Sequence, residues 1–203
     1  MARPDLLLAT RSAHKIAEIR RILPGLELES LDEAGVPETP GEAELETAST
    51  FLGNALAKAR HFAAVPGRGV LADDSGLRVD ALGGRPGVRT RRLAVDEGDA
   101  ERPDDDANNR TLLRLLRDVA PGRRGAAYVC AAVFVAPDGA ARSAIGVCRG
   151  GIVDAPRGEG GFGYDPLFGL PDGRVMAELT DAEKDAVSHR GRAFRALGAV
   201  AGF

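Results

Sequence analysis

The order of strand-like and helix-like segments constrains the fold of this 203-residue chain more than any other feature. Residues 5–10, with the apolar run Leu6-Leu7-Leu8, predict a short buried strand. A polar turn follows, and then Ile16, Ile19 and Leu23 at helical spacing. Two longer strand-like runs, residues 125–136 and 140–151, are joined by Pro137-Asp138-Gly139, which predicts a hairpin. Strands that alternate with helices and then give way to a hairpin indicate an α/β fold, a mixed β-sheet covered by helices.

The remaining segments extend this pattern. Residues 26–31, 69–73 and 77–79 predict strands, and residues 47–64, 108–119 and 191–200 predict helices, the first capped by Ser49 or Thr50. Thr180 and Glu183 have the spacing of a capping box. Residues 32–45 predict a loop, and residues 83–107 a mobile one, because seven acidic residues lie between Asp96 and Asp106. The length fits a single domain over residues 1–203.

Composition excludes several classes of protein. The 27 basic and 30 acidic residues give a net charge of −3, which is unsuited to coating nucleic acid, and a hydrophobic content of 44% argues against disorder. No apolar run approaches the roughly 20 residues that span a membrane, and no signal peptide is expected. Cys130 and Cys148 lie in apolar runs, so we expect reduced core cysteines in a cytoplasmic protein rather than a disulfide.

The first junction that could carry chemistry follows the first strand. It contains two hydroxyl side chains and one lysine at the start of a helix, in the run Thr10-Arg11-Ser12-Ala13-His14-Lys15. Backbone N–H groups at a helix N-terminus attract phosphate, so this run is a candidate phosphate cradle. A plain N-cap by Ser12 is the alternative, because the glycines of a nucleotide-binding fingerprint are absent.

The second junction is Asp73-Asp74-Ser75-Gly76, which we expect at the end of a buried strand. Adjacent carboxylates repel each other unless a cation offsets them, which favours a divalent metal site. Neighbouring residues of an extended chain point to opposite sides, so one carboxylate would bind the metal and the other would support it. A turn with an Asx motif is the alternative. Among Glu42, Glu44 and Glu46, which could simply be solvated, Glu46 is the best placed to add a ligand.

The third region combines glycines with two of the nine aromatic residues, in the run Gly158-Glu159-Gly160-Gly161-Phe162-Gly163-Tyr164-Asp165-Pro166. It suits a flat ligand stacked on Phe162 and contacted at its edge by Asp165, although a structural turn is an alternative. Lys184, His189 and Arg190 follow at what we predict to be a helix start, where cations oppose the helix dipole and favour an anionic or polar ligand.

Lysine is rare in this chain, which has 24 arginines and only three lysines, Lys15, Lys58 and Lys184. A lysine kept in such a background can mark a site that needs a compact ammonium group, and chance is the alternative.

At this point the chain resembles the inosine/xanthosine triphosphate pyrophosphatases, which remove non-standard purine nucleotides. The resemblance runs from Leu6 to about Leu197 and includes all three lysines. Six motifs in family order carry it: residues 10–15; Glu46 through Phe51-Leu52-x-Asn54-Ala55-x-x-Lys58-Ala59; Ala72-Asp73-Asp74-Ser75-Gly76-Leu77; Leu82-Gly83-Gly84-x-Pro86-Gly87; Gly160 through Pro166; and Ala177-Glu178-Leu179 through Lys184 to Ser188-His189-Arg190-Gly191.

The resemblance implies a Mg²⁺-dependent hydrolase that cleaves ITP, dITP or XTP to the monophosphate and pyrophosphate. It implies an elongated mixed sheet with helices on both sides, two lobes with the active-site cleft between them, and a homodimer. Asp74 would be the general base and a metal ligand, with Glu46 and Asp73 as further metal ligands. Lys15 would stabilise charge that develops at phosphorus. The substrate-binding residues would be Thr10, Arg11, Ser12, Ala13, His14, Lys15, Lys58, Ser75, Phe162, Gly163, Tyr164, Asp165, Lys184, His189 and Arg190.

The chain departs from the family pattern at Ser12, Gly53 and Arg91, and in the acidic segment 96–106. We expect these changes to tune activity without abolishing it. Three other hypotheses stay open: a nucleotide-binding sensor without turnover, a pyrophosphatase for other nucleotides such as modified pyrimidines, and a structural interaction domain.

Overall fold

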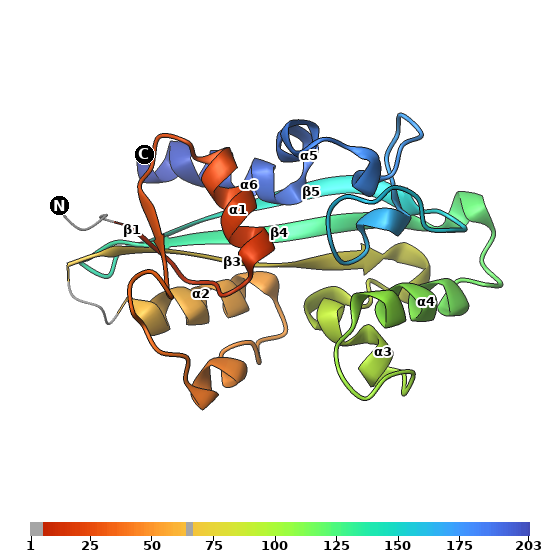
Figure 1. Ribbon diagram of the computed structural model, residues 1–203, viewed down its shortest axis with the longest axis horizontal. Helices are drawn as coiled ribbons and strands as arrows, with labels where there is room; N and C mark the ends of the chain where they lie inside the picture. Colours follow the sequence, from red (N-terminus) through yellow and green to blue (C-terminus); the bar gives the residue numbers. More distant parts are fainter. Residues whose placement is uncertain (1–5, 64–66) are drawn as a thin grey trace. The chain divides into compact units, whose positions relative to one another are not determined.

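The computed structural model describes residues 6–63 and 67–203. Six strands form one sheet in the order β2-β1-β3-β4-β5-β6. Their bounds are β1 Leu6–Leu8, β2 Leu28–Ser30, β3 Gly69–Val79, β4 Gly125–Val135, β5 Ala141–Ile152 and β6 Phe168–Gly169. Strand β1 pairs in parallel with β2 and β3, whereas β5 and β6 are antiparallel, so the predicted α/β class with a mixed sheet is confirmed (Figure 1).

Helices α1 and α2 begin after predicted capping residues, whereas the predicted starts at residues 108 and 191 are too late, because α4 begins at Asp105 and α6 at His189. Ser12 accepts a hydrogen bond from the backbone N–H of Lys15, and Thr50, not Ser49, caps the next helix. The box of Thr180 and Glu183 is also present. The α-helices are α1 Ala13–Ile22, α2 Phe51–Phe62, α3 Leu93–Asp96, α4 Asp105–Leu115, α5 Asp181–Val187 and α6 His189–Ala201. Short 3-10 helices lie at Pro40–Glu44, Asp80–Leu82, Gly87–Arg92, Pro121–Arg123, Asp165–Leu167 and Met176–Glu178.

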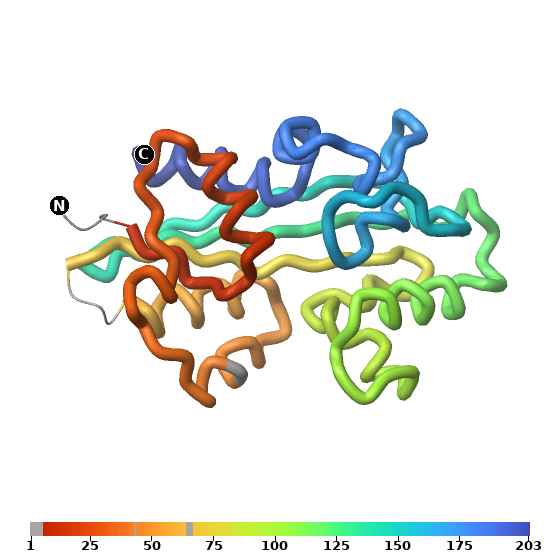
Figure 2. Tube along the Cα trace, in the orientation of Figure 1, coloured from red at the N-terminus to blue at the C-terminus, as the bar shows by residue number. Residues whose placement is uncertain are grey.

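Contacts along the chain define two compact units, and β3, β4 and β5 each contribute to both. Unit 1 consists of Met1–Ser75, Cys130–Val147 and Val187–Phe203, and unit 2 of Gly76–Val129 and Cys148–Ala186. The predicted hairpin is present: β4 and β5 run side by side, and the N–H of Ala136 donates to the carbonyl of Ala140 (Figure 2).

In unit 1, helices α1 and α6 cover one face of the sheet and α2 covers the other (Figure 1). The core between the sheet and the first pair of helices is apolar, and it contains Leu8, Ile19, Ile22, Leu28, Leu71, Cys130, Ala132, Ala193, Phe194 and Leu197. Helix α6 approaches β5 closely: a Cβ at Gly146 would lie 2.0 Å from the carbonyl oxygen of His189. Both cysteines are buried and neither forms a disulfide with another described residue, as expected.

In unit 2, the prediction of a mobile loop at residues 83–107 is wrong. This segment contains 3-10 helices and α3, whose Leu93 and Ala94 are buried. Asn108 on α4 accepts a hydrogen bond from the N–H of Ala94 and donates one to the carbonyl of Arg91. Ion pairs with arginines compensate part of the acidic charge, including Arg114 with Asp99 at 2.8 Å. The prediction of a loop failed because short helices leave too little apolar periodicity to detect.

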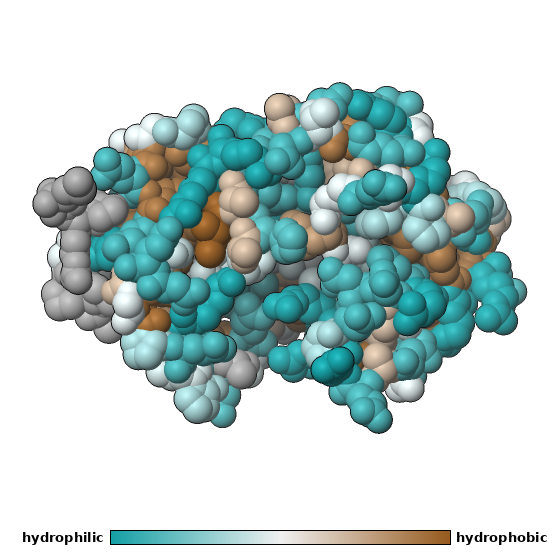
Figure 3. Space-filling model, viewed as in Figure 1, coloured by the Kyte–Doolittle hydropathy of each residue, from teal (hydrophilic) through white to brown (hydrophobic). Residues whose placement is uncertain are grey.

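Strand β3 also corrects a prediction, because it is continuous from Gly69 to Val79. The Asp73-Asp74-Ser75-Gly76 run therefore lies inside a strand and not in a turn after one, which removes the Asx-turn alternative. In the part of the chain that is described, no helix is long and apolar enough to cross a membrane. Figure 3 shows a mostly hydrophilic face with smaller apolar areas.

Candidate active site

Strand β3 directs the two adjacent carboxylates of unit 1 to opposite sides. Asp73 is fully buried, and its Oδ2 lies 3.1 Å from Lys15 Nζ of α1 and 3.2 Å from Arg190 Nη2 of α6. Asp74 instead contacts α2: its Oδ2 accepts a hydrogen bond from Asn54 Nδ2 at 2.9 Å, and its Oδ1 lies 3.9 Å from Lys58 Nζ. The alternation of an extended chain thus gives the two carboxylates different partners, as predicted.

Arg190 is the centre of a buried ionic network. Its side chain is 1% exposed, Nη1 donates to Glu18 Oε2 at 2.5 Å, and Nη2 also donates to Ser75 Oγ at 2.8 Å. The structure therefore places this guanidinium on Asp73 and Ser75, where it holds the acidic run in position. Glu18, on the same helix as Lys15, was missed by the sequence analysis, although an acidic residue beside the apolar Ile19 was a usable signal.

Helix α2 holds the second carboxylate and the segment that precedes the helix. Asn54 and Lys58 are four residues apart and share one helix face. Asn54 Oδ1 accepts a hydrogen bond from the N–H of Ala48, and Lys58 Nζ lies 2.7 Å from Glu46 Oε1. Glu46 and Asp74 are thereby brought to the same ammonium group. Asn54 was part of a motif but was not predicted as a site residue.

The family departure at Gly53 has a steric reason. A Cβ on this residue would lie 2.7 Å from the Cβ of Ala48 and 3.0 Å from Oγ1 of Thr50. A larger side chain would therefore require the segment before α2 to shift. With glycine at position 53, Glu46 and Asp74 are the carboxylates that the described residues bring within 4 Å of Lys58 Nζ.

The pKa values of the two aspartates are shifted in opposite directions. Burial alone would raise the pKa of Asp73, but Lys15, Arg190 and Lys58 together hold it well below its ordinary value. Burial raises the pKa of Asp74, and the charges of Lys58 and Lys15 offset this only in part. A carboxylate with a raised pKa is the stronger proton acceptor, so Asp74 is the better general base of the pair.

The candidate phosphate cradle opens α1. Ser12 caps the helix, and Thr10 Oγ1 accepts a hydrogen bond from the N–H of Ser12 at 3.2 Å. Ala13 and His14 are exposed in the first turn. Burial lowers the pKa of Lys15 although the charge of Asp73 opposes this. The cap and the cradle are compatible, because an N-cap satisfies only one of the free N–H groups at a helix start.

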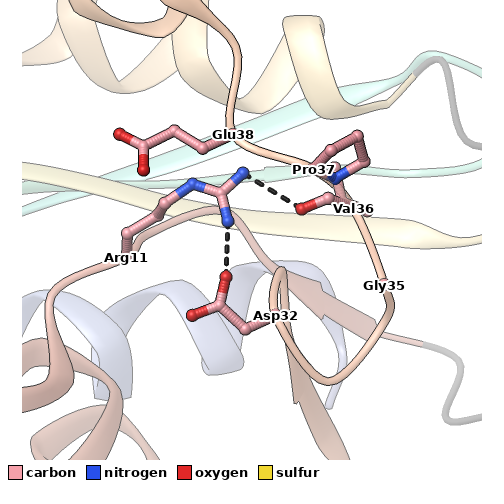
Figure 4. A pocket seen from close by; sticks show the side chains of 6 residues that line it. All are labelled: Arg11, Asp32, Gly35, Val36, Pro37 and Glu38. Carbon is pink, nitrogen blue, oxygen red and sulfur yellow. Dashed lines mark hydrogen bonds and ion pairs between the residues drawn. The ribbon is translucent and has the colours of Figure 1, made fainter.

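Arg11, next to the candidate phosphate site, forms ion pairs with two carboxylates. Its Nε and Nη2 donate to Glu42 at 2.9 and 2.8 Å, and its Nη1 lies 2.5 Å from Asp32 Oδ1. It lines a hollow together with Gly35, Val36, Pro37 and Glu38, and it also donates to the carbonyl of Val36 (Figure 4). Arg11 therefore fastens the segment after β2, and Glu42 is engaged by it.

In unit 2, the glycine-rich run brings Phe162, Asp165 and Lys184 together, as predicted. Asp165 is buried, and its Oδ2 accepts hydrogen bonds from the N–H of Phe162 at 3.0 Å and from Lys184 Nζ at 2.7 Å. Lys184 Nζ also lies 4.7 Å from the centre of the Phe162 ring. Because these donors engage Asp165, its carboxylate holds the loop together. Tyr164 is a buried anchor whose hydroxyl donates to the carbonyl of Thr90.

The prediction that Lys184, His189 and Arg190 lie together at one helix start is wrong for Lys184. Helix α5 ends at Val187 and α6 starts afresh after the N-cap Ser188, so Lys184 lies in the last turn of α5. A cation is favourable there. His189 and Arg190 occupy the first turn of α6, and both are buried.

The side chains around Asp73 and Asp74 can be compared with those that a metal ion needs. Within residues 6–63 and 67–203 there is no group of three carboxylate, imidazole or thiol side chains that could hold a metal. In that same part of the chain, Asp73 Oδ1 is buried without a hydrogen-bond donor. Mg²⁺ is usually held by one or two carboxylates, with water and substrate phosphates completing its shell. The residues therefore fit an ion that binds together with a polyphosphate.

Comparison with known proteins identifies the family of this chain. A model of the Ham1 family matches residues 6–200. A dITP/XTP pyrophosphatase from Frankia alni is 50% identical over 197 residues, 96% of each chain. A solved HAM1 protein from Coxiella burnetii is 37% identical with a TM-score of 0.81, covering 97% of this chain and 98% of that one. A dITP/XTP pyrophosphatase structure from Mycobacterium abscessus is 45% identical with a TM-score of 0.72, covering 96% and 97%. Over almost its whole length, then, the chain belongs to the Ham1 family.

Proposed function

We propose that this chain is a pyrophosphatase that hydrolyses non-standard purine nucleoside triphosphates, ITP, dITP and XTP, to the monophosphate and pyrophosphate. The observation that carries the proposal is the pair of adjacent carboxylates on β3, Asp73 held by Lys15 and Arg190, and Asp74 held by Asn54 and Lys58. The Frankia alni and Mycobacterium abscessus relatives support it, because both are named dITP/XTP pyrophosphatases. One catalytic domain would span residues 1–203.

Asp74 would accept the proton of the water that attacks phosphorus, since burial raises its pKa. The water oxygen bonds to phosphorus, the α–β phosphoanhydride breaks, and pyrophosphate leaves with the bridging oxygen. Thr10, Ser12, Ser75, Lys58, and the N–H groups of residues 11–14 would bind phosphates. Lys15 would stabilise the charge that develops in the transition state.

Mg²⁺ would be held by Asp74 and Glu46, with Asp73 in support through its unbonded Oδ1. When bound, the ion neutralises triphosphate charge and makes water a better nucleophile. Lys58 Nζ lies 2.7 Å from Glu46 Oε1 and 3.9 Å from Asp74 Oδ1 and compensates part of their charge. The family resemblance supports magnesium over other divalent ions, and oxygen ligands suit it.

Phe162, Gly163, Tyr164, Asp165 and Lys184 would form the nucleoside end of the site in unit 2, with the base stacked on Phe162. His189 would be a further hydrogen-bond donor to the nucleotide. Arg190 would act on the nucleotide indirectly, by holding Asp73 and Ser75 in position. Hypoxanthine and xanthine carry a carbonyl and an N1–H where adenine carries an amino group and a bare nitrogen. A site built for the first pattern leaves adenine with unmatched polar groups.

The test measures pyrophosphate and orthophosphate release from dITP, XTP, dATP, dGTP and dTTP at alkaline pH, with and without Mg²⁺. We expect metal-dependent pyrophosphate from dITP and XTP alone. Orthophosphate as the first product would place cleavage at the γ-phosphate and refute the mechanism. Binding without release of either product would favour a nucleotide sensor, and turnover of pyrimidine substrates would refute the specificity.

A cytoplasmic homodimer completes the proposal. Apolar side chains such as Ile145 and Val200 of unit 1 are more than half exposed and would gain from being covered. Light scattering with size-exclusion chromatography gives the mass directly: a value near 42 kDa, twice the 21.2 kDa of the chain, supports the dimer, and 21.2 kDa refutes it. No nucleic-acid or membrane partner is proposed.

A further inference from the structure

Helix α4 of unit 2 binds both polar backbone groups of one residue in the glycine-rich run, Gly163. The N–H of Gly163 donates to Asp105 Oδ2 at 2.8 Å, and the carbonyl of Gly163 accepts a hydrogen bond from Asn109 Nδ2 at 2.9 Å. Asp105 and Asn109 are four residues apart, so they lie on one face of the helix. Both polar backbone groups of Gly163 are therefore bonded to the same helix.

This residue sits where the backbone has the greatest freedom. Gly161 and Gly163 both have positive φ values, 75° and 63°, and they flank Phe162. Glycine enters this conformation readily and leaves it as readily, because no Cβ restricts it. The N–H of Phe162 itself donates to Asp165 Oδ2, and the two bonds from α4 fix the residue that follows it, so together these bonds limit where the Phe162 ring can lie.

Asn109 shows that the contact is specific. Its side chain is buried, and in the described part of the chain its Oδ1 has no hydrogen-bond donor. A buried acceptor without a donor costs folding free energy, and an apolar residue at this place would avoid that cost. The hydrogen bond from Asn109 Nδ2 to the carbonyl of Gly163 explains why an amide side chain occupies this place. The second hydrogen bond to Gly163 comes from Asp105, in the acidic first turn of α4, which departs from the family pattern.

We propose that Asp105 and Asn109 are positioning residues for the purine end of the substrate. They hold Gly163 so that the Phe162 ring is preset to stack on the base, and they do not touch the substrate themselves. The inference rests on the proposed function. A preset ring improves binding by reducing the ordering that the ligand must impose.

The test compares Asp105→Ala with Asp106→Ala. Asp106 is the next residue in the same first turn and is exposed, so its removal takes away the same charge near the same helix end. Asp104 remains the N-cap in both variants. We expect inosine monophosphate to bind about tenfold more weakly to Asp105→Ala, a loss of about 1.4 kcal/mol, and normally to Asp106→Ala. Pyrophosphate, which lacks a base, should bind equally to both, and Asp105→Asn, which keeps an acceptor oxygen, should recover most of the affinity.

A second readout needs no nucleotide. In protein labelled with ¹⁵N-glycine, the Gly163 amide hydrogen should exchange with solvent faster in Asp105→Ala and in Asn109→Ala, but not in Asp106→Ala. Unchanged exchange, unchanged inosine monophosphate binding in Asp105→Ala, or an equal loss of pyrophosphate binding would overturn the positioning role. If the wild type neither binds inosine monophosphate nor hydrolyses dITP, the proposed function is refuted and the purine role with it, whereas the exchange data still report on the hydrogen bonds to Gly163.

Discussion

Replacing Arg190 by Met tests how much of unit 1 depends on the buried ionic network. The guanidinium is 1% exposed and compensates Glu18 and Asp73, which are 6% and 0% exposed. Removing one partner of a buried ion pair costs about 3–5 kcal/mol, because the remaining charge stays buried. Asp73 keeps Lys15 at 3.1 Å, which places the expected loss near the lower end, about 3 kcal/mol. At roughly 2–4 °C per kcal/mol for a chain of this size, Tm should fall by about 6–12 °C.

Thermal unfolding followed by circular dichroism measures this loss. Arg192→Met is the matched control, since Arg192 lies on the same helix, is exposed, and donates to the carbonyl of Val147. Its Tm should change by less than about 2 °C, because exposed substitutions are usually within 0.5 kcal/mol. The double variant Glu18→Met/Arg190→Met removes both charges and should be more stable than Arg190→Met alone. Two results would refute the reasoning. One is a Tm for Arg190→Met within 2 °C of the control, and the other is a double variant whose loss in Tm equals the sum of the losses of Glu18→Met and Arg190→Met.

Three further predictions concern single side chains. Asp74→Asn should lower kcat by about 10²–10⁴-fold while nucleotide binding is largely retained, because it removes the general base; normal turnover would refute the assignment. Glu33 accepts hydrogen bonds from the backbone N–H of Ser30, from the Arg20 guanidinium and from the Ser30 hydroxyl, and these lower its pKa to about 2. The contribution of the Glu33 carboxylate to folding stability is therefore complete above pH 4.5 and is lost as the pH falls towards 2. Glu33→Gln should therefore lose less Tm than the wild type across that range, and parallel pH curves would contradict this. Burial raises the pKa of Cys130, so a thiol reagent at pH 8 should label it only as the protein unfolds, and rapid labelling of Cys130 in the native state would be inconsistent with its burial.

The α/β class followed from local signals. Apolar periodicity predicted the long helices and strands, and the caps Ser12 and Thr50 marked where α1 and α2 begin. These signals are local because hydrogen bonds and side-chain spacing within a helix involve residues only a few positions apart. The short helices between residues 83 and 107 escaped prediction, because α3, which carries the buried Leu93 and Ala94, has only four residues and is too short to show a helical period.

The sequence by itself determined which residue types could do the chemistry: the adjacent carboxylates, the three lysines and the glycine-rich run with its aromatic residues. Only the tertiary structure decided what each of them contacts. Asp73 and Asp74 are neighbours in the chain, yet a strand turns them to opposite faces, so one meets Lys15 and Arg190 and the other meets Asn54 and Lys58. Glu18 and Arg190 are 172 residues apart, and no local pattern joins them. Their pairing depends on the packing of α1 and α6 on the same face of the sheet, and that packing is set by the whole core and not by any one segment.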